Sequence, residues 1–568
     1  MAADYYDLGD YSRTVTTSSV RAQVWFGRGL NWAYAFNFEE AQSCFERAVN
    51  HDPCCAMAHW GIAFALGPNY NKGWRLFDAG DFVQSSEMAR AALARAQALA
   101  DRITPVERAL IEALPRRFAA EFLPPMERQP LNTAYADAMR EVYGAFPEDL
   151  DVASLFADAL LCVSPRQLWD LPTGEPKVPG TLEADGVLTR AMATPEGEKH
   201  PALNHLYIHL MEMSPRPELA IPQADRVRRM MPGASHMAHM ASHIDNAVGN
   251  YRGCIDANEI AAAANDVYLD RAEGVRFYHI YRAHDLYVQT YGAMMIGRFH
   301  QAWKSACRLR DALPEHILRV TSPPMADWAE SHVSAYVHVL IRFGKWEEVL
   351  ELDLPEDRDL YCVTVAMICY ARGVALSALG RIEEAEAAKV EFYAALAKVP
   401  DSRMSLPNKE VDVLKVAAAM LEGEFAYRVG DYDVAYGHLR NAIELEDALQ
   451  YADPRSWLQP VRHAYGALLL EQGHVVEAEA VYRADLGFDG SLPRAKVHPN
   501  NVWSLHGLYE CLVRLGRDDQ AAMIRMQRDI AVASADIPIA ASCYCRRSAY
   551  AAGEPEAGAG ESCCATAD

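Results

Sequence analysis

The chain has 568 residues, a hydrophobic fraction of 51% and a formal net charge of −23. This length exceeds what one hydrophobic core usually supports, so the chain either divides into domains or forms an array of units that pack on their neighbours. The negative charge disfavours nucleic acid and anionic membranes as partners. No apolar run is long enough for a membrane-spanning helix, and the acidic N-terminus lacks a secretory signal, so we expect a cytoplasmic protein.

A pattern of small and aromatic residues begins near residue 21. One expected helix carries an aromatic, a small residue and an aromatic, and the next carries alanine, aromatic and alanine before a proline. These positions are Trp25, Gly29, Trp32, Phe38, Ala41, Phe45, Ala48 and Pro53. Small residues let two helices approach closely, and the aromatic side chains fill the space toward the next pair. This spacing is that of the tetratricopeptide repeat (TPR).

The same pattern recurs along the rest of the chain. Copies fall near 370–388, 416–442 and 459–482, and weaker ones carry the glycine turns GNYRGC, GRFHQA, GKWEEV and GRDDQA. Roughly ten helix pairs and almost no strands are expected. The sequence therefore predicts an all-α, right-handed TPR-like superhelix (an α-solenoid) over residues 21–545, preceded by an N-terminal extension of residues 1–20.

Two segments interrupt the pattern. Residues 164–200 are rich in Pro and Gly and are predicted to form a long loop insertion with a short helix, able to close over a binding site. Residues 546–568 are small, acidic and low in complexity, which predicts a disordered tail. Thirteen cysteines, an odd number without framework spacing, indicate thiols rather than disulfides. For Cys543 with Cys545, and for Cys563 with Cys564, free thiols are favoured over a soft-metal site.

Eight of the nineteen histidines lie between residues 200 and 284, which marks this stretch as the candidate site. His205 and His209 are four residues apart, with Glu212 three further on, so all three share one helix face. The spacing of three and four residues places the next group on one face as well. That group is His236, His239 and His243.

The repeat frame gives these residues a common direction. His205 and His209 take the fifth and ninth positions of one unit, and His239 and His243 take the same positions of the next. His236 and His284 take second positions, and all of these positions line the concave groove of a TPR superhelix. We therefore expect six histidines and Glu212 to face one groove, on three consecutive first helices. Asp158, His338, Asn69 and Asn71 are further, weaker candidates.

Several imidazoles with one carboxylate suit Cu, Zn or Fe better than Mg or Ca. The metal ligands expected are His205, His209, His236, His239, His243 and His284. Glu212 is expected to be the catalytic acid/base or a bridging ligand. Without a metal, the groove histidines would instead contact a peptide or an anionic small molecule.

Five longer segments are shared with a group of long TPR proteins. They are PCCAMAHWGIAFALGPNYN, HPALNHLYIHLMEMSP, MPGASHMAHMASHI, WLQPVRHAYGALLL and ASCYCR. Over most of residues 20–547 the chain resembles long bacterial and fungal TPR-domain proteins with HxxxH and HMxxHI motifs. The resemblance implies the fold and recurring histidine motifs, and it implies no substrate. MAHMASHI here replaces the expected HMPSHI, which leaves the histidines in place and affects only the helix bend.

Two hypotheses of function follow. In the first, the protein is a metal-dependent enzyme that acts on a small molecule in the concave groove by oxidative or hydrolytic chemistry. In the second, it is a non-catalytic scaffold that binds a peptide or protein partner there, as most proteins of this fold do. Convergence of the histidine side chains on one point favours the first, and their dispersal along the groove favours the second.

Overall fold

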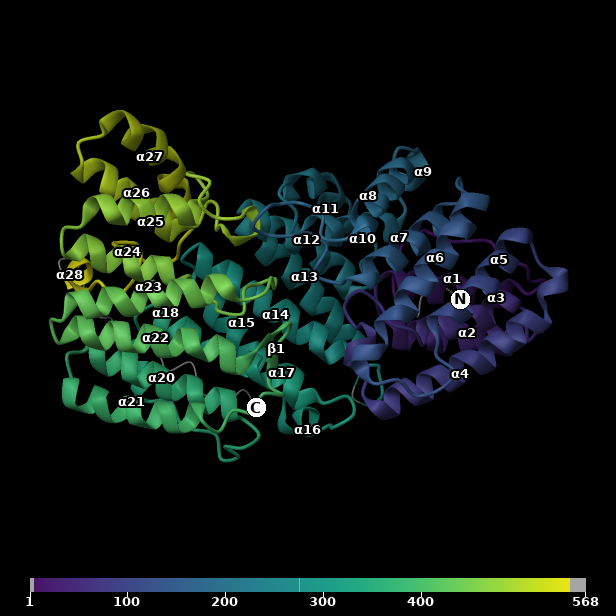
Figure 1. Ribbon diagram of the computed structural model, residues 1–568, viewed down its shortest axis with the longest axis horizontal. Coiled ribbons are helices and arrows are strands. Elements are labelled where there is room, and N and C mark those ends of the chain that lie inside the picture. Colours follow the sequence, from purple (N-terminus) through teal and green to yellow (C-terminus); the bar gives the residue numbers. More distant parts are fainter. Residues whose placement is uncertain (1–4, 275, 552–568) are drawn as a thin grey trace.

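A computed structural model describes residues 5–274 and 276–551, which form an all-α array. Consecutive helices pack side by side in pairs, and the pairs stack along the chain. Figure 1 shows the N-terminal helices at one end of the molecule, the C-terminal helices at the other, and helices α10 to α17 between them. The predicted all-α solenoid of TPR type is confirmed.

Helices α1 to α14 lie in the first half of the chain, and helices α15 to α28 lie in the second half. The first half contains α1 (Val20–Tyr34), α2 (Phe38–His51), α3 (Ala56–Ala65), α4 (Ala79–Ala98), α5 (Pro105–Ala113), α6 (Gln129–Ala145), α7 (Leu150–Val163), α8 (Pro179–Met192), α9 (Pro195–Glu198), α10 (Pro201–Met211), α11 (Ile221–Val227), α12 (Ser235–Val248), α13 (Tyr251–Leu269) and α14 (Tyr278–Met295). The second half contains α15 (Phe299–Ala312), α16 (Glu315–Leu318), α17 (Met325–Val333), α18 (Ala335–Arg342), α19 (Trp346–Leu350), α20 (Cys362–Ala378), α21 (Ile382–Leu396), α22 (Glu410–Arg428), α23 (Tyr432–Ala448), α24 (Val461–Glu471), α25 (Val475–Leu486), α26 (Val502–Arg514), α27 (Asp518–Ala533) and α28 (Arg547–Ala551).

Shorter elements lie between these helices. Among the residues that the structure describes there are six 3-10 helices: η1 (Trp74–Leu76), η2 (Ala100–Arg102), η3 (Leu114–Arg117), η4 (Pro125–Glu127), η5 (Pro217–Ala220) and η6 (Arg494–Lys496). The strands β1 (Met404–Ser405) and β2 (Asn408–Lys409) form one antiparallel pair, and no other strand occurs in the described ranges. The near absence of strands agrees with the sequence prediction.

Packing around Phe45 explains the repeat pattern. Its ring lies between Gly29 of α1 and Gly61 of α3, where an added Cβ would meet ring atoms at 2.7 and 2.5 Å. Tyr482 of α25 lies in the same way between glycines of α24 and α26. Any larger residue at these glycines would collide with the ring, so the small residues set how closely the helices approach.

The turn glycines have the conformation that their position demands. Gly249 and Gly344 have φ values of 75° and 64°, in the left-handed region that glycine enters at little cost. Each allows the chain to leave one helix and enter the next within a few residues. The turns predicted in GNYRGC and GKWEEV therefore end α12 and α18.

The segments that interrupt the repeat are partly helical. Within 164–200, residues 179–192 and 195–198 form α8 and α9, and the preceding loop contacts the loop after α3, where the backbone N–H of Arg166 donates to the Tyr70 hydroxyl at 3.1 Å. The N-terminal extension is anchored by Arg13, which forms an ion pair with Asp149. Of the predicted tail, residues 547–551 form α28, whereas Cys563 and Cys564 lie outside the described residues.

Segments distant in sequence enclose the middle of the array. The backbone N–H of Gly233 donates to the Asp7 carbonyl at 2.7 Å, and Arg494 donates to the Ala247 carbonyl at 2.7 Å. The side chain of Asn246 donates to Asp453 at 3.0 Å. The N-terminal residues therefore pack beside the start of α12, and the segment from 449 to 500 packs against its C-terminal end.

No helix in the described part of the chain is both long and apolar enough to cross a membrane.

Candidate metal centre

Three packed helices bring the predicted histidines together. Helix α10 carries His205 and His209, α12 carries His236, His239 and His243, and α14 carries His284. The histidines of α10 and α12 expose at most 7% of their surface, and His284 is half-buried. They lie in an enclosed interior rather than along an open groove, because residues 34–36, residues 70–71 and Asp453 pack against them.

The histidines form two groups that could each hold a metal ion, and within each group one potential ligand atom per residue lies within 4.8 Å of the others. We name the first the α10 group and the second the α14 group. The α10 group consists of His205, His209 and His236. The α14 group consists of His239, His243 and His284. The expected convergence therefore occurs, at two adjacent points rather than one.

In the α10 group, two rings are oriented with a free lone pair. Nδ1 of His205 lies 2.7 Å from the Tyr34 carbonyl oxygen, and Nδ1 of His209 lies 3.0 Å from Glu212 Oε1. Both acceptors require the ring proton on Nδ1, so each Nε2 has a lone pair. Both Nε2 atoms are buried, and no hydrogen-bond partner for them occurs in the described ranges. Histidine ligands of metals are typically held in this way.

His236, the third member, is oriented differently. The Asn71 side-chain nitrogen lies 3.2 Å from its Nε2, and the Asn71 oxygen accepts from Arg166 at 3.3 Å, which fixes the amide. The neutral ring of His236 therefore has its proton on Nδ1. Consequently, the α10 group offers two prepared nitrogen ligands and a third that binds only after Asn71 turns away. Asn71, a weaker candidate from the sequence, thus contacts a histidine of this group.

In the α14 group, hydrogen bonds fix the tautomer of His239. Its Nδ1 lies 2.7 Å from Asn258 Oδ1. The Asn258 nitrogen donates to the Cys254 carbonyl at 2.8 Å, so the amide oxygen must face the ring. A carboxylate oxygen of Asp285 lies 3.2 Å from the same Nδ1. His239 therefore has its proton on Nδ1 and a lone pair on Nε2.

His243 is held by two carboxylates. Its Nδ1 lies 2.6 Å from Glu212 Oε2 and 2.8 Å from Asp453 Oδ2, so this nitrogen also carries a proton. The Nε2 atoms of His239 and His243 then face one another at 3.1 Å. Two lone pairs at this distance repel, so a cation must lie between them, either a proton or a metal ion. Nitrogen ligands of a tetrahedral Zn²⁺ site are about 3.3 Å apart, so the separation suits a metal.

The pKa values of the buried groups indicate which cation lies between the Nε2 atoms of His239 and His243 when no metal is bound. Burial lowers the pKa of His239 to about 3 and that of His209 to about 4. Burial also opposes charge on His243, but Glu212 and Asp453 outweigh it and raise the pKa of His243 to about 10. Although burial works against it, His243 holds the pKa of Glu212 below its ordinary value. At neutral pH the Nε2 proton of His243 therefore occupies the position between the two rings.

Aromatic side chains fix the remaining faces of the rings. Phe36 stacks on His209 with ring centroids 5.7 Å apart, and Tyr70 contacts the same ring at 4.4 Å. Tyr281 contacts His236 at 4.5 Å. Because these rings exclude water, the polar contacts of the histidines act in an environment of low polarity.

A small cavity adjoins the centre on the side of Glu212. It has a volume of ≈ 30 Å³ and is lined by Glu212, Tyr451 and Asp453 among other residues. A volume of roughly 10–15 Å³ holds one water molecule, so this cavity admits only one or two molecules of that size. Glu212 and Asp453, which both contact His243, form part of its wall.

Several predicted and unpredicted residues complete the description. Both oxygens of Glu212 contact ring nitrogens, which links the α10 and α14 groups. Asp158 forms an ion pair with Arg117 at 3.4 Å, and His338 packs on Trp457, so neither joins a histidine group. Asp453 was not anticipated, because it lies in a loop far along the chain with no periodic relation to the histidines.

One cysteine expectation is corrected. Cys543 and Cys545 were expected to be free thiols, but they form a disulfide. The backbone between them turns so that the N–H of Cys545 donates to the Cys543 sulfur at 3.2 Å, which brings the two sulfur atoms together.

No protein-family model matches the sequence, and no curated protein matches it. Among solved structures, a monomeric IFIT1 variant with the capped RNA m7Gppp-AAAA is similar at 11% identity and a TM-score of 0.34, over 84% of this chain and 90% of that one. Naa15/Naa10 bound to HypK-THB gives 13% identity and 0.19, over 89% and 70%. The P58(IPK) TPR domain gives 12% and 0.21, over 88% and 99%. Similarities this distant carry no functional argument.

Proposed function

We propose that this protein binds a transition metal ion at the α14 group and uses it in chemistry on a small molecule. One observation carries the proposal: two buried imidazoles, each with its proton fixed on Nδ1, direct their Nε2 atoms at one another at 3.1 Å. His284 is the third ligand. Cu, Zn or Fe suits such a set of nitrogen ligands.

The α10 group is proposed as a second binding position. His205 and His209 supply prepared nitrogens, and His236 joins when Asn71 turns away from its ring. Glu212 accepts the Nδ1 proton of His209 and forms an ion pair with Nδ1 of His243, so we assign it as a positioning residue for both rings. The role of acid/base or bridging ligand expected for it from the sequence stays a prediction beside this one.

The chemistry follows from the metal and from the size of the interior. Bound Cu or Fe would supply oxidation with dioxygen, and bound Zn would supply activation of water. The adjoining cavity of ≈ 30 Å³ supports a very small co-substrate, such as water or dioxygen. A larger substrate would enter after displacement of the loop from 451 to 456, which carries Asp453.

The test is the metal content of protein purified without an affinity tag. We expect about one or more equivalents of Cu, Zn or Fe per chain. The double variant His239→Gln/His243→Gln should lose the metal bound at the α14 group while it keeps its helical circular dichroism. The matched control is His338→Gln, which changes a buried histidine outside both groups and should keep the metal.

The alternative is a non-catalytic scaffold that binds a peptide or protein partner. If the parent protein binds none of the three metals, even after incubation with each ion, the metal proposal fails. The same result would favour the scaffold.

A further inference from the structure

A C-terminal segment after α27 crosses the helices of the second half; we name residues 535–550 the strap. The carboxylate of Asp536 accepts the backbone N–H groups of Phe299 and His300 at 2.6 and 3.1 Å, at the start of α15. At the other end, Arg547 donates to the Ala378 carbonyl of α20 at 2.6 Å. The strap thus contacts helices from several repeats.

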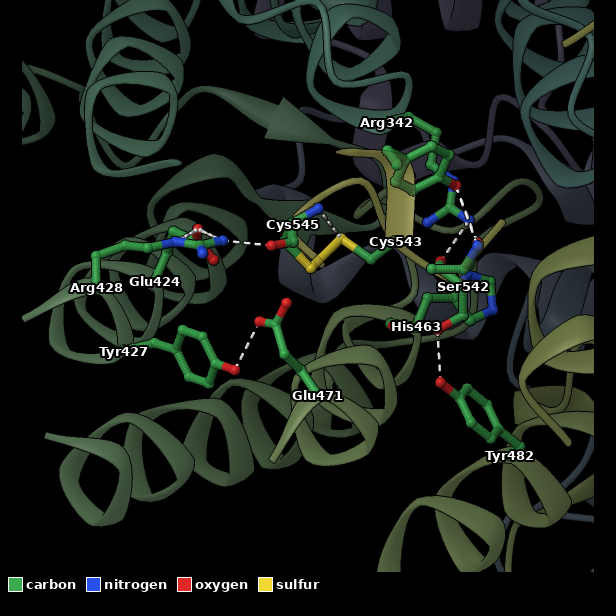
Figure 2. Close-up of a disulfide and its surroundings, with 12 residues drawn as sticks. Arg342, Glu424, Tyr427, Arg428, His463, Glu471, Tyr482, Ser542, Cys543 and Cys545 are labelled. Atoms are coloured by element: carbon green, nitrogen blue, oxygen red, sulfur yellow. Dashed lines mark hydrogen bonds and ion pairs between the residues drawn. A yellow bond between two sulfur atoms is a disulfide. The ribbon is translucent and has the colours of Figure 1, made fainter. Parts of the chain in front are cut away.

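Backbone carbonyls in the middle of the strap accept hydrogen bonds from neighbouring helices (Figure 2). Arg342 of α18 donates to the Ser542 carbonyl at 3.1 Å, and Arg428 of α22 donates to the Cys545 carbonyl. The Ser542 hydroxyl donates to the His463 carbonyl of α24 at 2.8 Å. Between these contacts lies the disulfide of Cys543 and Cys545.

Stabilisation alone does not account for this disulfide. A disulfide stabilises a protein mainly by restricting the unfolded chain, and the effect is small when few residues separate the cysteines. Cys543 and Cys545 are only two apart in sequence. The arginines and Ser542 already hold the same stretch of backbone, so the bond adds little to the connection between helices.

The two sulfur atoms have unequal surroundings. Cys545 exposes 4% of its surface, whereas Cys543 is partly exposed, so an incoming thiolate reaches Cys543 first. The backbone N–H of Cys545 donates to the Cys543 sulfur at 3.2 Å. A hydrogen bond of this kind stabilises the thiolate form of the accessible sulfur. One accessible sulfur with a stabilised thiolate and one buried sulfur suit thiol–disulfide exchange.

We propose that Cys543–Cys545 is a thiol–disulfide exchange site that takes a dithiol as its redox partner. A thiolate of the dithiol attacks the Cys543 sulfur, the Cys543–Cys545 bond breaks, and Cys545 leaves as a thiolate that takes up a proton. The second thiol of the partner loses its proton and attacks the mixed disulfide, which releases Cys543. The partner becomes a disulfide, and the protein gains two electrons and two protons.

Reduction also changes the strap. Two thiol sulfurs cannot remain at bonding distance, so the side chains of Cys543 and Cys545 must move apart, and we expect the backbone from Ser542 to Cys545 to adjust with them. The carbonyls held by Arg342 and Arg428 lie in this stretch, so their hydrogen bonds weaken. The redox state of one pair of cysteines is thereby coupled to the hydrogen bonds that join the strap to α18 and to α22.

The first test needs no variant. The full-length protein is equilibrated in buffers with different ratios of reduced to oxidised dithiothreitol, quenched with acid, alkylated with N-ethylmaleimide under denaturing conditions and digested with trypsin. Cleavage after Arg528 and Arg546 yields one peptide with Cys543 and Cys545 as its only cysteines. We expect an unmodified, disulfide-linked peptide at the oxidising end and a doubly alkylated one at the reducing end, interconverting reversibly while the protein stays folded.

Two results of that titration would overturn the proposal. One is a doubly alkylated peptide even in oxidised dithiothreitol, which would mean that no disulfide forms. The other is a disulfide that is reduced only when the protein is denatured. Cys563 and Cys564 lie on the peptide that begins at Ser548, so they do not interfere.

The second test assigns the roles of the two sulfurs. In Cys545→Ser the thiol of Cys543 should react with an aromatic disulfide reagent at least about tenfold faster than the thiol of Cys545 reacts in Cys543→Ser. The exposed thiol of Cys54 serves as the internal reference for reagent activity. Equal rates, or the reverse order, would refute Cys543 as the attacked sulfur.

Discussion

Replacement of Glu212 by Gln is the most informative single change at the candidate metal centre. Glu212 is buried; one of its oxygens accepts the Nδ1 proton of His209 at 3.0 Å, and the other forms an ion pair with Nδ1 of His243 at 2.6 Å. The amide of Gln has nearly the same shape, but one of its two ends is a donor. That end would face a ring N–H, so one histidine must move its proton to Nε2 and lose the lone pair that binds metal.

The size of the effect follows from the role of such partners. Loss of a residue that orients a histidine ligand typically lowers metal affinity by about 10- to 100-fold, equivalent to about 1.4–2.7 kcal/mol. Asp453 still holds His243 in the variant, so the lower part of this range is expected if the α14 group alone is occupied. Affinity would be measured by competition with a chromophoric chelator for Zn²⁺.

A matched control is Glu410→Gln. Burial raises the pKa of Glu410 to about 8, so this carboxyl is mostly protonated at pH 7 and the amide is a close replacement. The affinity of the Glu410→Gln variant for Zn²⁺ should equal that of the parent protein. If Glu212→Gln also binds Zn²⁺ with the affinity of the parent, the tautomer argument is refuted, and with it the positioning role of Glu212.

Three further predictions concern stability. Gly61→Ala places a Cβ 2.5 Å from the Phe45 ring and should lower the free energy of unfolding by about 1–3 kcal/mol, whereas Gly144→Ala, with open space around it, should raise it by about 0.5–1 kcal/mol in urea titrations. Free Zn²⁺ at about 100 times its dissociation constant should stabilise the parent by about 2.7 kcal/mol, and an unchanged melting temperature would contradict metal binding. Burial lowers the pKa of His338 to about 3 in the folded protein. In the unfolded chain the same histidine binds a proton near pH 6.5, whereas in the folded protein it stays neutral at that pH. Stability should therefore fall as pH drops from about 6.5, and His338→Gln should flatten this slope by about 1.4 kcal/mol per pH unit between pH 6 and 4.

The helix pairs and the convergence of the histidines were predictable from the sequence, because both depend on local periodicity. Phe45 and Gly29 identify a helix pair wherever it lies in space, and His239 with His243 must share a helix face. Nothing local indicates which distant segments cover that face. Burial of the centre and the contact of Asp453 with His243 depend on the curvature of the whole array, which no short pattern determines.

The disulfide illustrates the same limit. CYC is compatible with thiols, with a soft-metal site and with a disulfide, and only the path of the strap decides between them. Arg342 and Arg428 come from helices far from Cys543 in sequence. Their hydrogen bonds to the backbone of the strap, rather than any feature of the CYC motif, fix the local conformation.

The wide separation in sequence of the residues around His243 has a consequence for biosynthesis. The histidine helices leave the ribosome long before residues 451–456, so a nascent chain presents His239 and His243 without the carboxylate of Asp453. During this interval His243 has only Glu212 to hold its proton, and the interior is open to solvent on that side. The complete geometry of the centre therefore forms only after the C-terminal half has docked. A prematurely terminated chain would lack this geometry.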